Sequence, residues 1–440
     1  MPAPDSPLAA LIDQLFAQDL IGDPAVARKA RWILLDTLGC IISGMQSPEL
    51  SQLEKRLAAI DAGVFRFPRS ASRMAPSTAV WLAGAAACWD EACEGLARAH
   101  GRPGVPAIAA ALPIAWVTGK SLRALLAAIA AGYEIGGRLG EAMRIRAGMQ
   151  VDATWPSFAA AASASHLLGL NGAQAHEAIQ LAASQMPFSL YAPIRDGANG
   201  RSTYLAHAAA LGLSSALAIE SGIAAPRKAL EETNRLALEG KRVLPELAPP
   251  ELSLLLEGYI KPYAGARHLH YGAEAALKLR PRLAERLPAV TAMRLEIYEE
   301  AIQVCGNRAP RSATQAQFSL SYGIAAALVL GDLSPEAYRS ERLRDAQIKR
   351  LEQLVQVSAD RERSGANSRG ARLTVECAGE TLAENVDAVA GDPASPNTEA
   401  QVRDKFLRYA ASPLDEKAAA ALAEKVLKGP LGMKVHTLWT

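Results

Sequence analysis

Cationic and imidazole side chains gather in one short stretch, residues 261–270, which reads Lys-Pro-Tyr-Ala-Gly-Ala-Arg-His-Leu-His. It holds Lys261, Arg267 and two of the seven histidines of the chain, His268 and His270, and it contains no acid. Ala and Leu at helical spacing follow, which predicts a helix beginning close to His270. Because a helix N-terminus attracts anions, the stretch is typical of a site for a carboxylate-bearing small molecule. A solvated basic loop in front of a helix is the alternative interpretation.

Two further loops carry polar side chains. The first, residues 92–104, is polar, contains three glycines and follows the end of a buried helix. We expect one cleft to be lined by Asp90, Glu91, Glu94, His100 and Arg102, although each alone is also explained by loop solvation. The second, residues 187–201, is long, and long loops inside compact domains are often functional. It ends in Arg201, and Tyr204 follows within one helical turn.

Helical patterns dominate the first 262 residues and return at the end of the chain. The predicted helices are 7–20, 24–44, 77–92, 105–117, 121–139, 155–168, 171–184, 202–221 and 398–428. After about residue 288 the pattern alternates with period two, which predicts strands at 290–298, 353–358, 371–377 and up to Val386. Helices at 314–330, 335–340 and 342–351 intervene. The sequence therefore predicts a mainly α protein: a helical domain from residues 1–262 and 396–440, and an inserted smaller α/β domain from residues 263–395.

Composition excludes several classes of protein. The chain has 440 residues, of which 50% are hydrophobic and 21% charged, so it can build a large core and is not disordered. Its net charge of +2 gives no sign of binding nucleic acid or a membrane. Five scattered cysteines predict neither a zinc site nor a disulfide framework, and no signal peptide is visible. We expect a cytoplasmic protein without metal or cofactor.

Five stretches, taken in order, resemble one family. They are Leu34–Gly39, Gly132–Gly140, His166–Leu170, Lys261–His270 and Ala316–Tyr322. The chain resembles the MmgE/PrpD family, whose members include 2-methylcitrate dehydratase, cis-aconitate decarboxylase and iminodisuccinate epimerase. The resemblance implies a homodimer whose interdomain cleft binds di- or tricarboxylates without a metal. The alanine-rich helices, which offer more apolar surface than one layer can cover, also favour a dimer.

The resemblance also carries over to single positions. Lys261, His270 and Tyr322 match residues of the family's pocket, and Arg201 stands where many members have Lys. The histidine of a usual His-Pro pair becomes Arg102 here, although His100 could replace it if the loop is shifted. Family members also carry an aspartate in this loop. With the shifted count it corresponds to Asp90, and with the unshifted count it corresponds to Ala92. A second family histidine is replaced by Asp152, so the resemblance supports anion binding better than one particular reaction.

The predicted function is that of a cofactor-independent lyase of the hydratase/dehydratase type, which removes a proton next to a carboxylate of a small di- or tricarboxylate. An isomerase or epimerase, a decarboxylase, or a non-catalytic carboxylate-binding relative are the alternatives. Nearby positive charge should keep His270 neutral and suited to act as the base. The catalytic candidates are His270, Lys261, Tyr322, Asp90 and His100. The candidates for substrate binding are Arg201, Arg102, Tyr204, Asp152 and Arg267.

Overall fold

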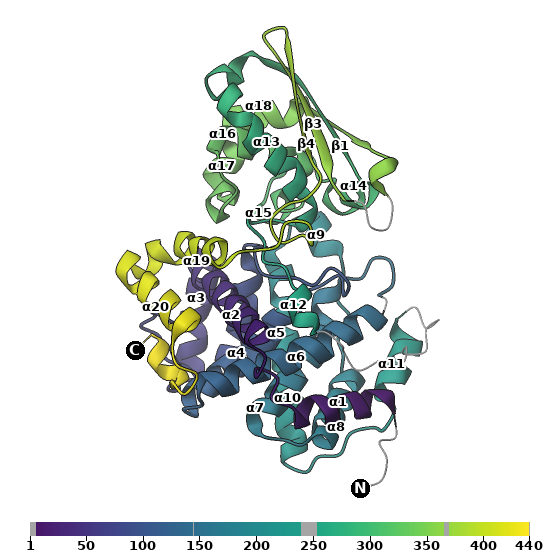
Figure 1. Ribbon diagram of the computed structural model, residues 1–440, viewed down its shortest axis with the longest axis vertical. Coiled ribbons are helices and arrows are strands. Elements are labelled where there is room, and N and C mark those ends of the chain that lie inside the picture. Colours follow the sequence, from purple (N-terminus) through teal and green to yellow (C-terminus); the bar gives the residue numbers. More distant parts are fainter. Residues whose placement is uncertain (1–5, 144, 239–252, 365–368, 440) are drawn as a thin grey trace.

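The computed structural model describes residues 6–143, 145–238, 253–364 and 369–439, and it divides into two parts. Figure 1 shows a large part built from helices, which contains both the first half of the chain and its C-terminal helices, and a smaller part that carries the sheet. The predicted fold class, mainly α with a smaller α/β domain, is confirmed. The domain boundaries near residues 262 and 396 stay predictions.

The helical part begins with a run of short to medium helices. They are α1 (Pro7–Ala17), α2 (Pro24–Gly44), α3 (Pro48–Ile60), α4 (Pro76–Trp89), α5 (Gly104–Val117), α6 (Leu122–Ala142), α7 (Pro156–Leu168), α8 (Gly172–Ser184), α9 (Ala192–Asp196), α10 (Tyr204–Glu220), α11 (Ala229–Ala237) and α12 (Leu254–Glu257). Capping residues define several starts: the carboxylate of Asp23 accepts a hydrogen bond from the backbone N–H of Ala25, and Pro24 occupies the first helical position.

Small residues let the central helices pack closely. A Cβ atom added at Gly136 of α6 would lie 2.4 Å from the Cβ of Ala159 in α7, and one at Gly212 of α10 would lie 2.3 Å from that of Ala160. Larger side chains at these two glycines would push the helices apart. The abundance of alanine thus translates into a tightly packed helical core, as the composition suggested.

The C-terminal helices α19 (Glu399–Leu414) and α20 (Glu416–Lys428) return to pack on α2 (Figure 1). A buried ion pair joins them: Nζ of Lys405 lies 2.5 Å from Oδ1 of Asp36 and 2.6 Å from the carbonyl oxygen of Ala92. The tail is therefore part of the helical core.

The smaller part contains a four-stranded mixed sheet in the order β2-β1-β3-β4. The strands are β1 (Val290–Ile297), β2 (Val355–Ala359), β3 (Ala371–Cys377) and β4 (Glu380–Val386). β1 pairs with β2 in parallel and with β3 antiparallel, and β3 and β4 form a hairpin. The helices are α13 (His270–Leu283), α14 (Glu299–Cys305), α15 (Ala313–Ala316), α16 (Leu320–Leu330), α17 (Ser340–Arg344) and α18 (Ala346–Leu354). Among the described residues, every named strand lies between 290 and 386, as predicted.

Two chain segments connect the parts, and they are bonded to each other. The N–H of Ile260 donates to Oδ1 of Asn397 at 2.8 Å, and Nδ2 of Asn397 donates back to the carbonyl of Ile260 at 3.0 Å. Close by, Arg267 donates to the carbonyl of Ala390 and to the carboxylate of Asp392. These bonds fix the basic stretch relative to the second connecting segment.

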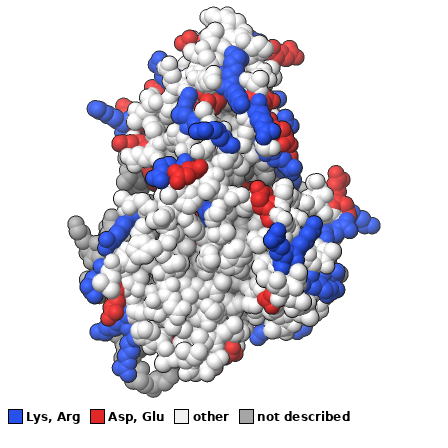
Figure 2. Space-filling view, turned by 180° about the vertical axis from the view of Figure 1, so that it is seen from behind, with Lys and Arg blue, Asp and Glu red and all other residues white. Residues whose placement is uncertain are grey.

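Surface charge is distributed unevenly. Figure 2 shows that one broad face of the helical part carries very few charged side chains, whereas they crowd the smaller part and the edges. Within the described ranges, one helical stretch, Asn199–Glu220, is long and apolar enough to cross a membrane, but 56% of its most apolar window is buried. Because α10 packs against α4, α5, α7 and α8, we interpret it as a core helix. The cytoplasmic location stays a prediction.

Candidate active site

A cleft of about 660 Å³ opens between the two parts of the molecule. The turn between α2 and α3, the end of α4, the segment before α10 and the second half of α19 line it from the helical part. α15 and the segment from Ser334 to α17 line it from the smaller part. Its polar side chains include Ser43, Asp90, Ser202, Gln317 and Tyr338.

The loop after α4 places two non-glycine residues in the left-handed backbone region. The angle φ is +51° at Glu91 and +50° at His100. Such a conformation costs about 1–3 kcal/mol and persists only where the surroundings enforce it. Here the backbone of Gly95 pairs with that of Tyr259 in both directions, with N···O distances of 3.0 and 2.8 Å. The loop is thereby fixed to the segment that leads into the basic stretch.

Five charged side chains meet behind this loop, and we call them the ionic cluster: Glu91, Arg102, Asp152, Arg201 and Lys261. The carboxylate of Glu91 accepts from Nη1 of Arg102 at 2.9 Å, from Nη1 of Arg201 at 2.5 Å and from Nζ of Lys261 at 2.8 Å. Asp152 accepts from both guanidinium groups. No member has a side chain more than 9% exposed. Arg201 and Lys261, which we expected to converge on the interdomain cleft together with His270, thus meet at Glu91, but none of the three is among the residues that line the cleft.

The ionic cluster contains three cations and two acids. Burial alone would raise the pKa of Glu91, but Arg102, Arg201 and Lys261 hold it well below its ordinary value. Glu91 is therefore ionised at neutral pH, and the three cations outnumber the two acids by one, although each cation contacts an acid of the cluster. The sequence analysis did not predict that Glu91 and Asp152 would form ion pairs with these three cations.

The ammonium group of Lys261 has no free donor. Its Nζ lies 2.9 Å from the carbonyl oxygen of Glu91, 2.8 Å from Oε1 of the same residue and 3.2 Å from the carbonyl oxygen of Gly265. An ammonium has three N–H donors, and these three acceptors use them all. Lys261 is thus placed to hold Glu91 rather than to take a proton.

His270, the first residue of α13, is completely buried. Its Nε2 lies 3.3 Å from the carbonyl oxygen of Gly265, and since a carbonyl can only accept, Nε2 must carry the hydrogen of this bond. Burial, and then the charges of Arg267 and Lys261, lower the pKa of His270 well below its ordinary value, so the ring is neutral. Its Nδ1 has no hydrogen-bond partner among the described residues and offers an unprotonated lone pair.

Two more groups complete the arrangement. Nε of Arg201 also has no partner among the described residues, although the guanidinium stacks on Phe318 at 5.4 Å. Asp90, on the cleft wall, accepts from the hydroxyl of Ser43 at 2.7 Å, and burial raises its pKa to about 6. The backbone carbonyl of Asp90 accepts from the N–H of Gly265. A cation, a neutral imidazole and a carboxyl that titrates near neutrality are thus connected.

Comparison with known families identifies the family of this chain. The family model of the MmgE/PrpD N-terminal domain matches residues 7–238, and the family model of the MmgE/PrpD C-terminal domain matches residues 263–428. The chain belongs to the MmgE/PrpD family. It is also similar to the cis-aconitate decarboxylase-like protein oryM of Aspergillus oryzae, with 26% identity over 328 residues, which cover 69% of this chain and 67% of that protein.

The sequence resemblance predicted that Arg102 and Asp152 stand in place of two family histidines, and this stays a prediction. Arg102 and Asp152 are both in the ionic cluster, and they bond to each other through Nε and Oδ1 at 3.3 Å and through a second, shorter contact. Nε2 of Gln150 donates to the same carboxylate at 2.9 Å. Arg102 and Asp152 thus form a mutual ion pair.

Three more predicted residues lie outside both the ionic cluster and the lining of the cleft. The hydroxyl of Tyr322 donates to the carbonyl of Ala337 within the smaller part, and Tyr338, whose ring centre lies 6.0 Å away, lines the cleft instead. Arg267 anchors Asp392, as described above. His100 is exposed on the loop. Tyr322 is therefore not on the wall of the cleft, contrary to our expectation.

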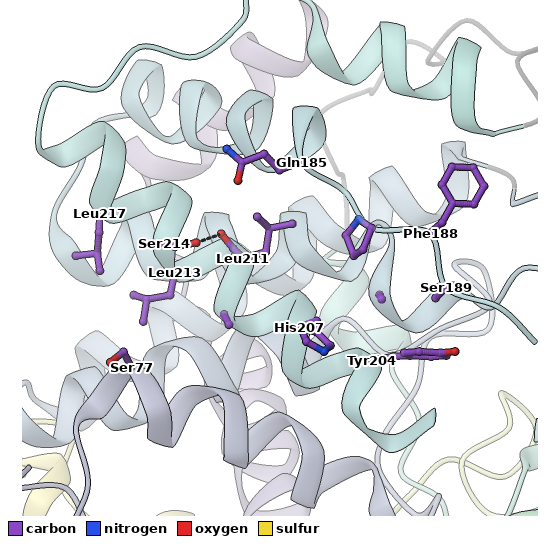
Figure 3. A pocket seen from close by; sticks show the side chains of 13 residues that line it. Ser77, Gln185, Phe188, Ser189, Tyr204, His207, Leu211, Leu213, Ser214 and Leu217 are labelled. Atoms are coloured by element: carbon purple, nitrogen blue, oxygen red, sulfur yellow. Dashed lines mark hydrogen bonds between the residues drawn. The ribbon is translucent and has the colours of Figure 1, made fainter. Parts of the chain in front are cut away.

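Tyr204 lies in a different cavity, a surface groove of about 680 Å³ on the helical part. Figure 3 shows Tyr204 and His207 on one helix, α10, with Phe188 and Ser189 on the loop beside them. The hydroxyl of Tyr204 donates to the carbonyl of Leu190 at 3.0 Å, which ties this loop to α10. Tyr204 does not line the interdomain cleft.

Glu91 is the residue whose importance the sequence did not reveal. It was expected among the polar residues of the loop, but Asp90 was selected as the site carboxylate. In the structure the two neighbours face different surroundings: Asp90 lines the cleft, and Glu91 holds three cations. Nothing in the local sequence separates them, because the left-handed backbone at Glu91 is what turns the second carboxylate inward.

Proposed function

We propose that this protein is a lyase that removes a proton next to the carboxylate of a small organic acid, with His270 as the base. The observation that carries the proposal is the state of His270: a buried, neutral ring whose Nε2–H is held by Gly265 and whose Nδ1 has no partner among the described residues. A general base must be unprotonated at the working pH, and its basic nitrogen must not already accept a hydrogen bond from the protein.

The neighbouring residues suit the other roles. Arg201 is a permanent cation with an open Nε donor, and it would hold the substrate carboxylate and the charge that moves onto it when the proton leaves. In a dehydration, the C–H electron pair forms the new C=C bond, the C–O bond breaks, and the hydroxyl leaves as water after accepting a proton. Asp90, with its pKa raised to about 6, can donate that proton.

Decarboxylation is the second candidate, and the name of the relative from Aspergillus oryzae favours it. In that reaction the C–C bond to the carboxyl group breaks, carbon dioxide leaves, and the electron pair remaining on carbon takes up a proton. The imidazole of His270 can deliver that proton once its Nδ1 has taken one up from solvent.

Two substitutions of His270 test the proposal. His270→Gln retains an N–H donor for the carbonyl of Gly265 but has no basic nitrogen, and His270→Asn places an amide near the position of Nδ1. We expect both to lower kcat by about 10²–10⁴-fold, the usual contribution of a general base, with little change in KM.

The assay should not presuppose the substrate. A panel of small mono-, di- and tricarboxylic acids is incubated in D₂O, and NMR follows both loss of the C–H signal and formation of product. Exchange without elimination would indicate an isomerase or epimerase, and loss of carbon dioxide a decarboxylase. Full turnover by His270→Gln would contradict the proposal and move the search to Asp90 or His100.

A further inference from the structure

The C-terminal helix α19 contributes one tyrosine to the wall of the interdomain cleft. Tyr409 and Asp90 are both among the residues that line this cleft. Tyr409 is only 4% exposed, and its hydroxyl has no hydrogen-bond partner within the described part of the chain. A buried hydroxyl without a partner destabilises the fold that contains it, so its presence needs a reason.

The packing of Tyr409 does not require this hydroxyl. Nζ of Lys405, one turn earlier on α19, lies 5.4 Å from the centre of the Tyr409 ring, and α19 packs against α2. A phenylalanine would fill the same space and keep the contact with the ammonium group. The hydroxyl is thus the part of Tyr409 that the folded chain leaves unused.

Other polar side chains of the cleft wall are already bonded within the protein. The hydroxyl of Tyr338 donates to the carbonyl of Ala264 at 2.9 Å, and Nε2 of Gln317 donates to the carbonyl of Trp89 at 3.2 Å. Of the buried side-chain polar atoms that lack a partner in the described ranges, the hydroxyl of Tyr409 is the one that belongs to a residue lining the cleft. This hydroxyl is therefore the group that a ligand in the cleft would satisfy.

Tyr409 and Asp90 offer complementary hydrogen-bonding groups. Burial, and after it the nearby Cys40 and Asp90, raise the pKa of Tyr409 well above its ordinary value, so the hydroxyl keeps its proton and can donate. Asp90, with its pKa raised to about 6 by burial, is mostly ionised at pH 7. The hydrogen bond from Ser43 goes to Oδ2 of Asp90, so Oδ1 can accept from a ligand.

We infer that Tyr409 determines specificity for a hydroxyl group of the ligand, which it binds together with Asp90. A hydroxyl can donate to Oδ1 of Asp90 and accept from Tyr409 at the same time, because it is both a donor and an acceptor. A hydrogen atom or a methyl group at this position of the ligand can do neither. The inference rests on the proposed function, in which Asp90 protonates the leaving hydroxyl, and it adds Tyr409 as a second group that holds this hydroxyl.

The experiment compares three pairs of acids that differ by one hydroxyl: butanoate and 3-hydroxybutanoate, succinate and malate, and propane-1,2,3-tricarboxylate and citrate. Calorimetry measures the affinity of the native chain and of Tyr409→Phe for every acid, with both enantiomers of the chiral ones. We expect the native chain to bind the hydroxy acid of at least one pair about tenfold or more tightly, since one of the two hydrogen bonds is to a charged group. Tyr409→Phe should lower this preference about fivefold, the usual effect of losing one hydrogen bond.

Tyr338→Phe is the matched control. It also removes a tyrosine hydroxyl from a residue of the cleft wall, but this hydroxyl is already donated to the carbonyl of Ala264. It should leave the preference for the hydroxy acid unchanged.

Urea unfolding separates a binding role from a structural one. Because the hydroxyl of Tyr409 has no partner in the described ranges, Tyr409→Phe should leave the unfolding midpoint unchanged or raise it. Tyr338→Phe loses a hydrogen bond and should lower the midpoint. If Tyr409→Phe lowers the midpoint as much as Tyr338→Phe, the hydroxyl of Tyr409 is already bonded in the free protein and the inference is overturned.

The outcomes also separate this inference from the proposed function. An unchanged preference in Tyr409→Phe, or no preference for the hydroxy acid in any pair, overturns the inference, even if His270→Gln abolishes turnover and the lyase proposal stands. A preference that falls in Tyr409→Phe and not in Tyr338→Phe, without proton exchange or elimination from any acid of the panel, supports binding of a hydroxyl by Tyr409 and overturns the lyase. Failure of all the acids to bind, together with absence of turnover, overturns both.

Discussion

Removal of an acid from the ionic cluster should destabilise the protein more than removal of a cation. Glu91→Gln leaves three cations with Asp152 alone, so the uncompensated charge rises from one to two. Lys261→Met leaves two cations with two acids, and Glu91 keeps both of its arginine partners. Both substitutions break the contact of 2.8 Å between Nζ of Lys261 and Oε1 of Glu91. One removes the acid of this pair, and the other removes the cation.

The expected magnitudes differ by about 2 kcal/mol. Removing one partner of a buried ion pair costs about 3–5 kcal/mol when it leaves an unpaired charge, which applies to Glu91→Gln. For Lys261→Met the main loss is the hydrogen bonds to the carbonyls of Glu91 and Gly265, and we expect about 1–3 kcal/mol.

Urea unfolding at pH 7, followed by far-UV circular dichroism and tryptophan fluorescence, measures the difference. A chain with two structural parts need not unfold in one step, so the transition midpoints of the variants are compared and the two probes are required to agree. The Lys405–Asp36 pair is the control: with one charge of each sign, Lys405→Met and Asp36→Asn should cost about the same. If Lys261→Met proved as destabilising as Glu91→Gln, the charge-balance argument would be wrong.

Two further predictions concern the surface and pH. We propose a homodimer formed through the sparsely charged face of the helical part. Leu217 is exposed and lines the same surface groove as exposed Phe188, and we expect Leu217→Asp to give monomers in multi-angle light scattering; a native chain that is monomeric at micromolar concentration would contradict this. Nδ1 of His268 is hydrogen-bonded to the hydroxyl oxygen of Tyr298, and burial, then Arg369 and other nearby cations, lower the pKa of His268 to about 3. Because the unfolded chain then binds more protons, the contribution of His268 to stability is complete above pH 6.5 and declines towards pH 3. Between pH 7 and 5 the native chain should lose up to about 2 kcal/mol more than His268→Asn in urea unfolding, and parallel losses would refute the assignment.

The fold could be predicted from the sequence because its signals are local. Helix starts such as Asp23-Pro24 carry their own cap, and the alternation in β1 and β3 directly reflects one buried and one exposed face. The helix α3 was not among the predicted elements, since it is polar and mostly at the surface. Local patterns thus determined the elements, and the family resemblance supplied their arrangement.

The site was predicted less completely, for a physical reason. Convergence of Arg201 and Lys261 follows from their positions in the family, but their partners are set by tertiary packing. Glu91 lies 110 residues from Arg201 and 170 from Lys261. Whether a carboxylate joins such a cluster depends on the left-handed backbone at Glu91 and on the pairing of Gly95 with Tyr259, neither of which has a sequence signature.

The return of the C-terminal helices has a consequence for how the protein is made. α2 lies near the start of the chain, yet part of the surface it buries, including Asp36, is covered by α19, which is synthesised more than 350 residues later. The helical core therefore cannot close during translation until α19 and α20 have left the ribosome. The smaller part, whose sheet is complete at Val386, can form first. Contacts between residues so far apart in sequence make folding slow, so the exposed face of α2 is a natural binding site for a chaperone on the nascent chain.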